Sequence, residues 1–386
     1  MERSHRSFGP VPLGMPPRPE IPAAPSMARK GRGATINPPS RFDKQRREAF
    51  ADDWSDQGWT DGGGTEYVPP PIRTEVAVDS TKTIIAYNQS PDIGFDRSIN
   101  PYRGCEHGCV YCFARPTHSY FGLSAGLDFE TKLFAKPEAA KLLEAELASP
   151  KYQCQPIAMG TNTDPYQPVE RSFKVTRSIL EVLERCDHPV TIVTKGALVA
   201  RDIDILARMA AKNLAWVGLS VTTLDRELAR RMEPRAAAPA RRLAAMRALS
   251  EAGIPVGVMV APVIPAINDH EIEAILEAAR DAGARSAGFV MLRLPHEIKD
   301  LMTDWLDVHA PMKKKRVLEL IRGMRKGKLN DGEFGSRFRP TGGYAGMIRQ
   351  RFVIAARRLG LEREGRPLDC AKFKKPARAG EQLTLF

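Results

Sequence analysis

The sequence has few cysteines and no long apolar run. No stretch of eighteen consecutive apolar residues occurs in the 386-residue chain, so we expect no transmembrane helix and no membrane partner. Residues 1–20 lack the apolar centre of a secretory signal. We therefore expect a cytoplasmic protein, and disulfide bonds are rare in that compartment.

The few cysteines are unevenly placed. Three of the six, Cys105, Cys109 and Cys112, lie in the segment SINPYRGCEHGCVYCFARPTH, residues 98–118. Such a cluster in a protein without a disulfide framework indicates metal chemistry. For Cys186 and Cys370, buried or incidental thiols are the default interpretation. Cys154 precedes a predicted strand and is expected at the end of the core opposite to the catalytic groups.

Acidic residues are fewer than basic ones, which gives the chain a formal net charge of +12. An excess of this size favours a polyanionic partner such as nucleic acid. The excess is strongest in residues 310–330, where Lys313, Lys314, Lys315 and further basic residues face the single acid Glu319. A basic helix is more often only a solvated face, so this feature alone does not establish binding of nucleic acid.

Composition divides the chain into four parts. Residues 1–75 are rich in Pro, Gly and Arg and are predicted to be a disordered basic extension. A core is predicted for 76–305, a basic helical extension for 306–369, and a loose tail ending in QLTLF for 370–386.

The predicted core alternates between short apolar runs and amphipathic stretches. The runs are QPIAMGTN, PVTIVTKG, LAWVGLSVTT, IPVGVMVAPVI and SAGFVMLRL, and a sixth strand is expected near residues 97–101. Apolar strands that alternate with helices are typical of βαβ units and a parallel sheet. The pattern predicts an α/β fold, a partial (β/α)6 barrel of the TIM type. Catalytic groups then lie at the carboxyl ends of the strands.

Three thiolates in one loop suit a [4Fe–4S] cluster. Cys105, Cys109 and Cys112 can hold three irons and leave the fourth without a protein ligand, and Gly104 and Gly108 let the backbone fold tightly. An open coordination position is where a substrate or cofactor binds metal directly. A structural zinc site is the alternative, with His107 or His118 as the fourth ligand.

The segment CEHGCVYC resembles the signature of the radical S-adenosylmethionine (radical SAM) enzymes, with Tyr111 as its aromatic residue. The resemblance covers about residues 95–300. It implies that S-adenosylmethionine (AdoMet) binds the open iron through its methionine group. Electron transfer from the cluster then cleaves it to a 5′-deoxyadenosyl radical. A reductant such as flavodoxin or ferredoxin is an implied partner.

The resemblance also indicates cofactor-binding positions at the strand ends. Thr161, Asn162, Thr163 and Asp164 follow the second barrel strand, with Thr163 and Asp164 preferred, although Asp164-Pro165 is also an ordinary turn former. Lys195 and Ser220 end the next two strands and are candidates to bind the AdoMet carboxylate. Lys195 can equally cap the barrel rim in solvent.

Two further segments stay open at this stage. Val260, Ala261 and Pro262 resemble the stretch that contacts adenine in the family, but an apolar strand end is what any barrel needs. Arg235, like Glu233, lies between predicted helices, where it faces either the cofactor or solvent.

Among radical SAM enzymes, NPYRGCEHGCVYCFARPTH and GTNTDPYQPVE are most similar to the spore photoproduct lyase or DNA repair photolyase-like group. That lyase carries a hydrogen-donor cysteine at the end of its second strand, where this chain has Met159 and Gly160. Phe113 also lacks a hydroxyl for radical relay. The resemblance thus implies radical chemistry on DNA, but not spore photoproduct reversal. An enzyme acting on protein, RNA or a small molecule, and a non-enzymatic iron–sulfur or zinc protein that binds nucleic acid, are the alternatives.

The last residues, EQLTLF, resemble the peptide by which bacterial DNA polymerases and repair proteins dock on the sliding clamp. In this interpretation Leu383, Leu385 and Phe386 enter an apolar groove and Gln382 binds at its rim. The alternative is that Gln382–Phe386 folds back onto the body of the protein.

Overall fold

The computed structural model describes residues 28–43, 72–361 and 367–377. Contacts divide the chain into two units. One unit, residues 1–25 and 45–70, lies outside the described residues. Everything below belongs to the other unit.

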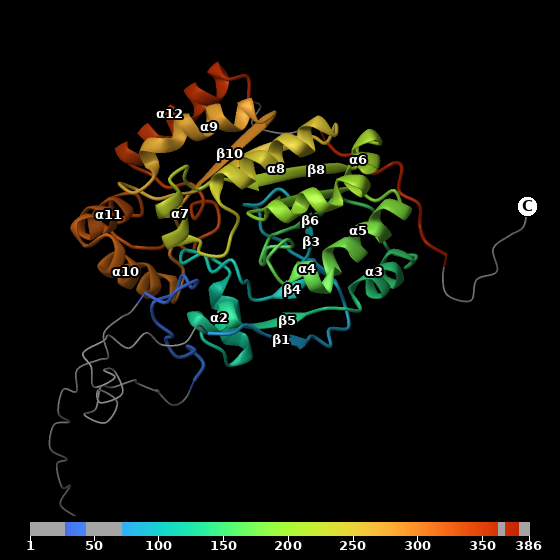
Figure 1. Cartoon of the computed structure of the whole chain (residues 1–386), viewed down its shortest axis with the longest axis horizontal. Coiled ribbons are helices and arrows are strands. Elements are labelled where there is room, and N and C mark those ends of the chain that lie inside the picture. Colours follow the sequence, from blue (N-terminus) through green and yellow to red (C-terminus); the bar gives the residue numbers. More distant parts are fainter. Residues whose placement is uncertain (1–27, 44–71, 362–366, 378–386) are drawn as a thin grey trace, which may run out of the picture. The chain divides into compact units, whose positions relative to one another are not determined.

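A seven-stranded sheet forms the centre of this unit, in the order β10-β9-β8-β7-β6-β3-β2 (Figure 1). Strands β3 and β6–β10 are parallel to one another, and β2 pairs antiparallel with β3 at the edge. The bounds of these strands are β2 Ile85–Tyr87, β3 Arg97–Ile99, β6 Ile157–Met159, β7 Val190–Thr194, β8 Ala215–Ser220, β9 Val256–Val263 and β10 Ser286–Met291.

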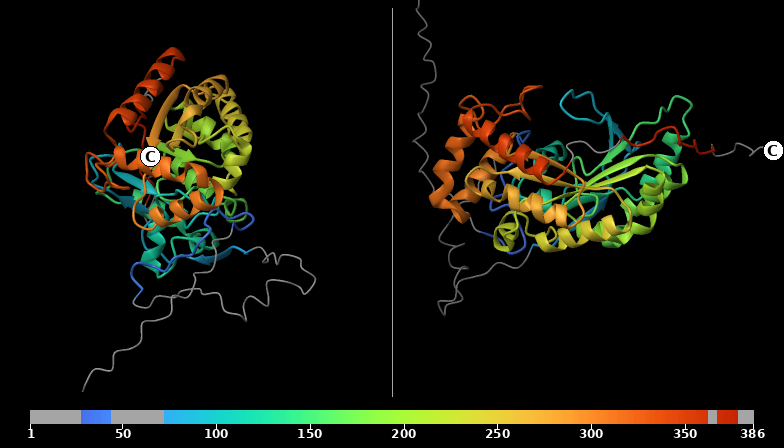
Figure 2. Two further views of the ribbon diagram at one scale, coloured as in Figure 1. Left: turned by 90° about the vertical axis from the view of Figure 1, so that its left-hand side faces the viewer. Right: turned by 90° about the horizontal axis from the view of Figure 1, so that it is seen from above.

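Helices follow the parallel strands and cover one face of the sheet, as seen from above in Figure 2. Helices α5, α6, α8 and α9 make this layer, and their apolar sides pack against near-continuous Val, Ile and Leu of the strands. The helices are η1 Arg115–Phe121, α2 Leu127–Thr131, α3 Ala139–Leu147, α4 Glu170–Phe173, α5 Val175–Arg185, η2 Ala197–Asp202, α6 Ile203–Ala211, α7 Arg226–Met232, α8 Pro239–Glu251, η3 Asp269–Glu271, α9 Ile272–Asp281, α10 Ile298–His309, α11 Pro311–Gly323 and α12 Gly343–Arg358.

The six parallel strands confirm the predicted partial (β/α)6 arrangement. Each predicted run became a strand, and each amphipathic stretch between them became one or two helices. Period-2 and period-3.6 patterns are the most dependable sequence signals when they alternate regularly. The sheet is open, since β10 and β2 are its two edges.

A second, three-stranded sheet was not predicted. It has the order β1-β5-β4, with β1 Glu75–Val78, β4 Tyr102–Arg103 and β5 Lys132–Ala135. β1 pairs parallel with β5, and β4 pairs antiparallel with it. These strands are too short, and β1 too exposed, to show a clear pattern in the sequence. Their role is to fix both ends of the cysteine segment.

Residues 28–43 differ from the prediction that residues 1–75 form a disordered extension. They pack on the core: Ala34 is fully buried and Arg32 donates hydrogen bonds to the carbonyl oxygens of Glu130 (2.9 Å) and Ile72. Their Pro/Gly/Arg composition hides this, because the backbone and the long polar side chains make the contacts. The rest of 1–71 lies outside the described residues.

The two helices predicted in the basic extension are present as α11 and α12. α12 packs on the sheet edge, with the rings of Phe352 and Phe289 4.6 Å apart. After a short undescribed stretch, residues 367–377 run along the amino ends of the strands, where the Lys374 N–H donates to the Cys186 carbonyl (2.8 Å). Gln382–Phe386 lies outside the described residues. None of the helices in the described ranges combines the length and apolar character needed to cross a bilayer.

Candidate active site

The three clustered cysteines lie in a loop, called here the cluster loop (residues 104–114), that follows β3 and β4. Gly104 and Gly108 both have positive φ, +72° and +67°, as the predicted tight folding requires. At Gly108 a Cβ would approach Glu130 Oε2 to 2.7 Å, so no larger residue fits without movement. The loop is therefore shaped by its glycines and by the chain packed around it.

A fully buried ion pair, Arg115–Glu130, holds the cluster loop from behind. The guanidinium donates to the carbonyl oxygens of Cys109 (2.8 Å) and Gly108 (3.0 Å) and to those of Ala125 and Gly126. Glu130 also accepts the backbone N–H groups of Gly33 (3.0 Å) and Ala34 (2.8 Å) from the N-terminal segment. These bonds satisfy both charges and fix the backbone that carries the thiols.

The thiols themselves sit in apolar surroundings. Cys105 packs with Ala114, Phe129 and Cys112, and both Cys105 and Cys109 are buried. Burial raises the pKa of Cys105 far above its usual value, and Asp164 and the other two thiols add to this. Burial and Glu233 likewise raise the pKa of Cys109, while Lys195 lowers it. Cys105 contacts Cys112, and Cys112 and Cys109 line the same pocket, so the three thiols share one region.

A pocket of about 260 Å³ opens beside the cluster loop at the carboxyl ends of the strands. Its lining residues come from the loop, from five parallel strands or the residues that follow them, and from the segment after α11. They are Cys109, Tyr111, Cys112, Phe113, Gly160, Val193, Lys195, Ser220, Met259, Ala261, Pro262, Val290, Met291, Leu292, Arg293 and Phe338. The pocket brings together Cys109, Cys112, Tyr111, Lys195 and Ser220. It lies at the carboxyl ends of the strands, where functional groups were expected.

Tyr111 is held by a buried polar network. Its hydroxyl donates to Glu233 and lies 3.2 Å from Thr222 Oγ1, and Glu233 is paired with the buried Arg242. Burial raises the pKa of Glu233, and the Arg242 guanidinium opposes this. Glu233 is thus an internal support of the pocket wall, and not a solvated charge. Arg235 pairs with Glu106 at 2.9 Å.

Thr163 and Asp164 lie near the cluster loop but outside the pocket lining. The Thr163 hydroxyl donates to the Tyr102 carbonyl (3.1 Å). Asp164 accepts from the Thr194 hydroxyl (2.6 Å) and the Lys195 N–H (2.7 Å), and His107 Nδ1 lies 3.3 Å away. Burial opposes ionisation of Asp164, but His107 and these donors together lower its pKa to about 2. The carboxylate ties the cluster loop to the end of β7.

The neighbours of Asp164 also form a turn. Asn100 Oδ1 accepts the N–H groups of Asn162 (3.0 Å) and Thr163 (3.2 Å) and lies 3.4 Å from the Thr161 hydroxyl. This segment therefore forms a turn, as one interpretation of the sequence expected. A turn here does not conflict with the other interpretation, in which its residues bind the cofactor. Contact of Thr163 or Asp164 with a cofactor stays a prediction.

At the end of β9 the pocket receives Met259, Ala261 and Pro262, whereas Val260 is buried in the core. Alternate residues of a strand point to opposite faces, which separates Val260 from its neighbours. Contact of Val260 with adenine stays a prediction, and Ala261 and Pro262 are the better placed members of that stretch. Lys195 Nζ lies 5.6 Å from the centre of the Tyr111 ring.

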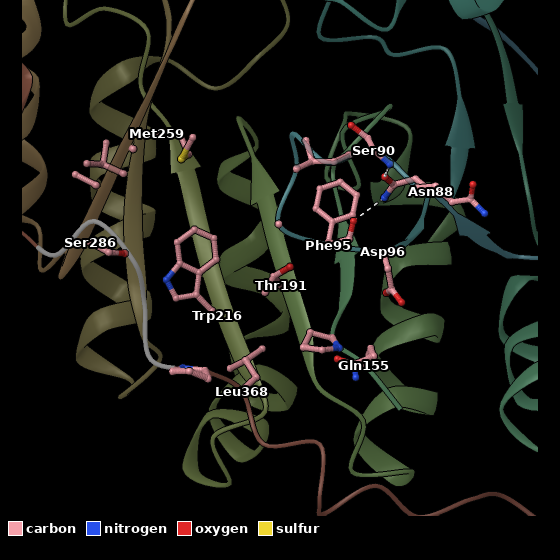
Figure 3. A pocket seen from close by; sticks show the side chains of 18 residues that line it. Asn88, Ser90, Phe95, Asp96, Gln155, Thr191, Trp216, Met259, Ser286 and Leu368 are labelled. Atoms are coloured by element: carbon pink, nitrogen blue, oxygen red, sulfur yellow. Dashed lines mark hydrogen bonds between the residues drawn. The ribbon is translucent and has the colours of Figure 1, made fainter. Parts of the chain in front are cut away.

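A larger cavity of about 950 Å³ lies on the same open face, toward the amino ends of the strands. Figure 3 shows Ser286, Met259, Trp216 and Thr191 side by side across the sheet, with Phe95 beyond them. No cysteine lines this cavity, and its one acidic residue, Asp96, is already paired with Arg97 (2.8 Å). Its size alone would favour this cavity as the active site, but the clustered cysteines and Lys195 line the smaller pocket. Met259 borders both.

Sequence reasoning missed several residues of the site. Arg115 and Glu130 were not singled out, although Arg115 lies inside the quoted motif. Arg293 and Phe338 also line the pocket, and the only available signal was an arginine near the end of the predicted apolar run SAGFVMLRL. Contacts between residues far apart in the chain carry no local pattern.

The cluster loop, the open parallel sheet and the pocket between them agree with the comparisons with known proteins. The chain belongs to the radical SAM superfamily: residues 99–279 match the profile described as "Radical SAM superfamily". Uncharacterized proteins of Mycobacterium tuberculosis and Mycobacterium bovis are each 36% identical over 242 residues, which is 61% of this chain and 71% of theirs. An uncharacterized protein of Methanocaldococcus jannaschii is 29% identical over 200 residues, 52% of this chain and 73% of its own.

Solved structures similar to this fold include spore photoproduct lyase. A mutant of it with bound AdoMet and a dinucleoside spore photoproduct has a TM-score of 0.54 and 16% identity, covering 74% of this chain and 80% of that one. At this identity the similarity concerns the fold. It confirms the α/β architecture expected from the sequence.

The cofactors of the family are a [4Fe–4S] cluster and AdoMet. Among the described residues, no three His, Cys, Asp or Glu side chains converge on one point as a single metal ion requires. A cluster has a different requirement, since each thiolate binds its own iron. Cys105, Cys109 and Cys112 in one braced loop fit this requirement. When bound, the reduced cluster supplies the electron that cleaves AdoMet to the 5′-deoxyadenosyl radical.

Lys195→Ala is expected to weaken AdoMet binding about tenfold to a hundredfold, because a charge-assisted hydrogen bond contributes about 1.5–3 kcal/mol. Equilibrium titration of the anaerobically reconstituted protein with AdoMet measures this. Lys151→Ala, at an exposed lysine outside the pocket, is the matched control. Unchanged affinity of Lys195→Ala with an intact cluster would return Lys195 to the role of a solvated strand end.

Proposed function

We propose that this radical SAM enzyme acts on DNA in a repair-like, lyase-like reaction that differs from reversal of the spore photoproduct. The pocket beside the cluster loop holds the cofactors, and a nucleotide of the DNA is the substrate. A cytoplasmic location and reduction by a flavodoxin or ferredoxin belong to the same proposal.

The observation that carries the proposal is the junction between the pocket and the most basic part of the chain. Arg325, just after α11, donates to the carbonyl oxygen of Leu292 in the pocket wall (2.9 Å). α11 buries Val317, Leu318 and Ile321, and the cations of this region point outward. The exposed ones are Lys313, Lys315, Arg316, Arg322, Lys326 and Lys328. Such cations bind phosphates in a salt-dependent way.

Similarity to a lyase that binds a dinucleoside adds support, and the pocket explains the expected departure from it. Gly160 lines the pocket with φ +86°, and a Cβ there would overlap the carbonyl oxygen of Val193. A cysteine does not fit at this position without backbone movement. Of the thiols in the described chain, those lining the pocket are Cys109 and Cys112, which are cluster ligands in this proposal. A thiol is therefore not expected to be the hydrogen donor.

Radical chemistry on a protein, an RNA or a small molecule is the second candidate, and a non-enzymatic iron–sulfur protein is the third. The experiment is anaerobic reconstitution, followed by incubation with AdoMet, a reductant and deuterium-labelled DNA. We expect four irons per chain and deuterium that passes from a nucleotide to 5′-deoxyadenosine. Cleavage without any label from DNA would favour the second candidate. Absence of cleavage with a full cluster would favour the third.

Recruitment to a bacterial sliding clamp by Gln382–Phe386 is part of the proposal. The tail is expected to bind at about micromolar affinity alone and to gain from effective concentration on clamp-loaded DNA. Calorimetric titration of the clamp with the full chain and with a chain lacking these residues tests it. Equal binding, or none by either, would indicate the fold-back alternative.

A further inference from the structure

The pocket contains an arginine, Arg293, whose guanidinium has no hydrogen-bond partner among the described residues. Arg293 follows β10 and lines the pocket, and its Nε is buried without an acceptor in the described part of the chain. No hydrogen bond or ion pair of its other nitrogens is found there either. Its carbon Cζ stacks 4.4 Å from the centre of the Phe338 ring. A buried donor left unpaired is unfavourable, so this side chain is available for an anion that enters the pocket.

Two other arginines lie beside it, and both make hydrogen bonds that Arg293 lacks. Arg337 pairs with Asp92 (2.7 Å) and stacks over Phe334 (4.6 Å) and Phe338 (5.2 Å). Arg325 donates to the carbonyl oxygens of Leu292 and Arg337, although its Nε, like that of Arg293, has no acceptor among the described residues. Burial and the charges of these two arginines lower the pKa of Arg293 to about 10, while Asp92 and Asp331 oppose this. Arg293 is therefore cationic at neutral pH, in a region where positive charge is in excess.

The position of Arg293 separates it from the candidates for the AdoMet carboxylate. Lys195 follows β7 and Ser220 ends β8, whereas Arg293 follows β10 at the edge of the sheet. The adenine candidates Ala261 and Pro262 lie on the neighbouring strand, β9. Two phenylalanines line the pocket together with Arg293: Phe338, on which the guanidinium stacks, and Phe113, which is 55% exposed. Aromatic rings beside a guanidinium are typical of sites that stack a base and bind its phosphate.

We propose that Arg293 is the phosphate-binding residue of the substrate subsite, where it binds a phosphodiester of single-stranded DNA whose base lies against the exposed ring of Phe113. This inference rests on the proposed function and deepens it. A planar guanidinium binds a phosphate with two parallel hydrogen bonds. A phosphate bound in this way would supply the acceptor that the Nε of Arg293 lacks.

The test uses the reconstituted full chain and a fluorescent single-stranded oligonucleotide, with binding measured by anisotropy at several salt concentrations. Arg293→Gln should weaken binding about tenfold to a hundredfold and reduce the slope of log K against log salt by about one. AdoMet affinity and iron content should not change, and the unfolding temperature should not fall, because an unpaired buried charge is removed. Arg358→Gln, in an exposed pair with Glu277, is the matched control and should bind normally.

Each outcome bears on a different claim. If the wild-type chain does not bind the oligonucleotide, the proposed function fails. If it binds and Arg293→Gln binds equally with the same salt slope, this inference fails and the proposed function stands. Loss of AdoMet affinity would assign Arg293 to the cofactor and also overturn the inference. If Arg293→Gln does not fold, Arg293→Met, which keeps a long unbranched side chain but has no donor, carries the same expectation.

Discussion

Replacement of any one of Cys105, Cys109 and Cys112 by alanine is expected to abolish the brown chromophore and all reductive cleavage of AdoMet. In the proposed assignment each thiolate would bind a separate iron, and the residues found in the pocket offer no substitute thiol. Iron and sulfide analysis, the visible spectrum and 5′-deoxyadenosine formation measure the loss after anaerobic reconstitution.

Cys154→Ala is the matched control, because Cys154 precedes β6 at the opposite end of the strands. There its thiol lies near that of Cys370; burial and this neighbour raise the pKa of Cys154 to about 12. The variant should keep both cluster and cleavage. A complete cluster in any of the three alanine variants would contradict the assignment, as would one zinc per chain in anaerobically purified protein.

Glu130→Ala should lower the free energy of unfolding by about 3–5 kcal/mol. The substitution leaves the Arg115 guanidinium, fully buried, without its counter-charge, and it removes the acceptor of the Gly33 and Ala34 N–H groups. The cluster loop should loosen as well, so we expect lower iron content after reconstitution. Urea denaturation of the protein, followed by circular dichroism, measures the first effect.

Glu144→Ala is the control for this variant. Glu144 pairs with Arg185 on the surface, where both side chains are exposed, and such pairs contribute about 0–1 kcal/mol. If the two variants were destabilised equally, the buried pair would not be the support that its hydrogen bonds suggest. Glu130→Gln, which keeps an acceptor, should fall between them.

Local patterns in the sequence were sufficient for the parallel strands and their helices, and for finding the clustered thiols. Cys105, Cys109 and Cys112 lie close together in the chain, and the strands and helices alternate with their own periods. Local patterns cannot show which residues at the end of an apolar strand face the pocket and which face the core. Val260 and Ala261 look equivalent in the sequence, but strand alternation places only Ala261 in the pocket.

The partners of polar side chains were equally inaccessible. Asp164 was expected near the cofactor, and its actual partners, His107 and Thr194, come from two other elements. The Glu130 carbonyl accepts from the Arg32 guanidinium, and the Glu130 carboxylate accepts from the Gly33 N–H, about a hundred residues earlier in the chain. One group in each of these bonds is a backbone group that any sequence possesses. Such contacts depend on how distant parts of the chain pack together in the folded protein, and composition does not predict this.

The docking of residues 28–43 behind the cluster loop has a consequence for folding order. Gly33 and Glu130 are 97 positions apart, so closing that loop costs on the order of 4 kcal/mol of chain entropy. Contacts of such high sequence separation form late, after the more local strand–helix units. We therefore expect a stage at which the sheet exists while the back of the cluster loop is still uncovered. Residues 28–43 then close over the back of the loop, while the face that carries Cys109 and Cys112 stays open to the pocket.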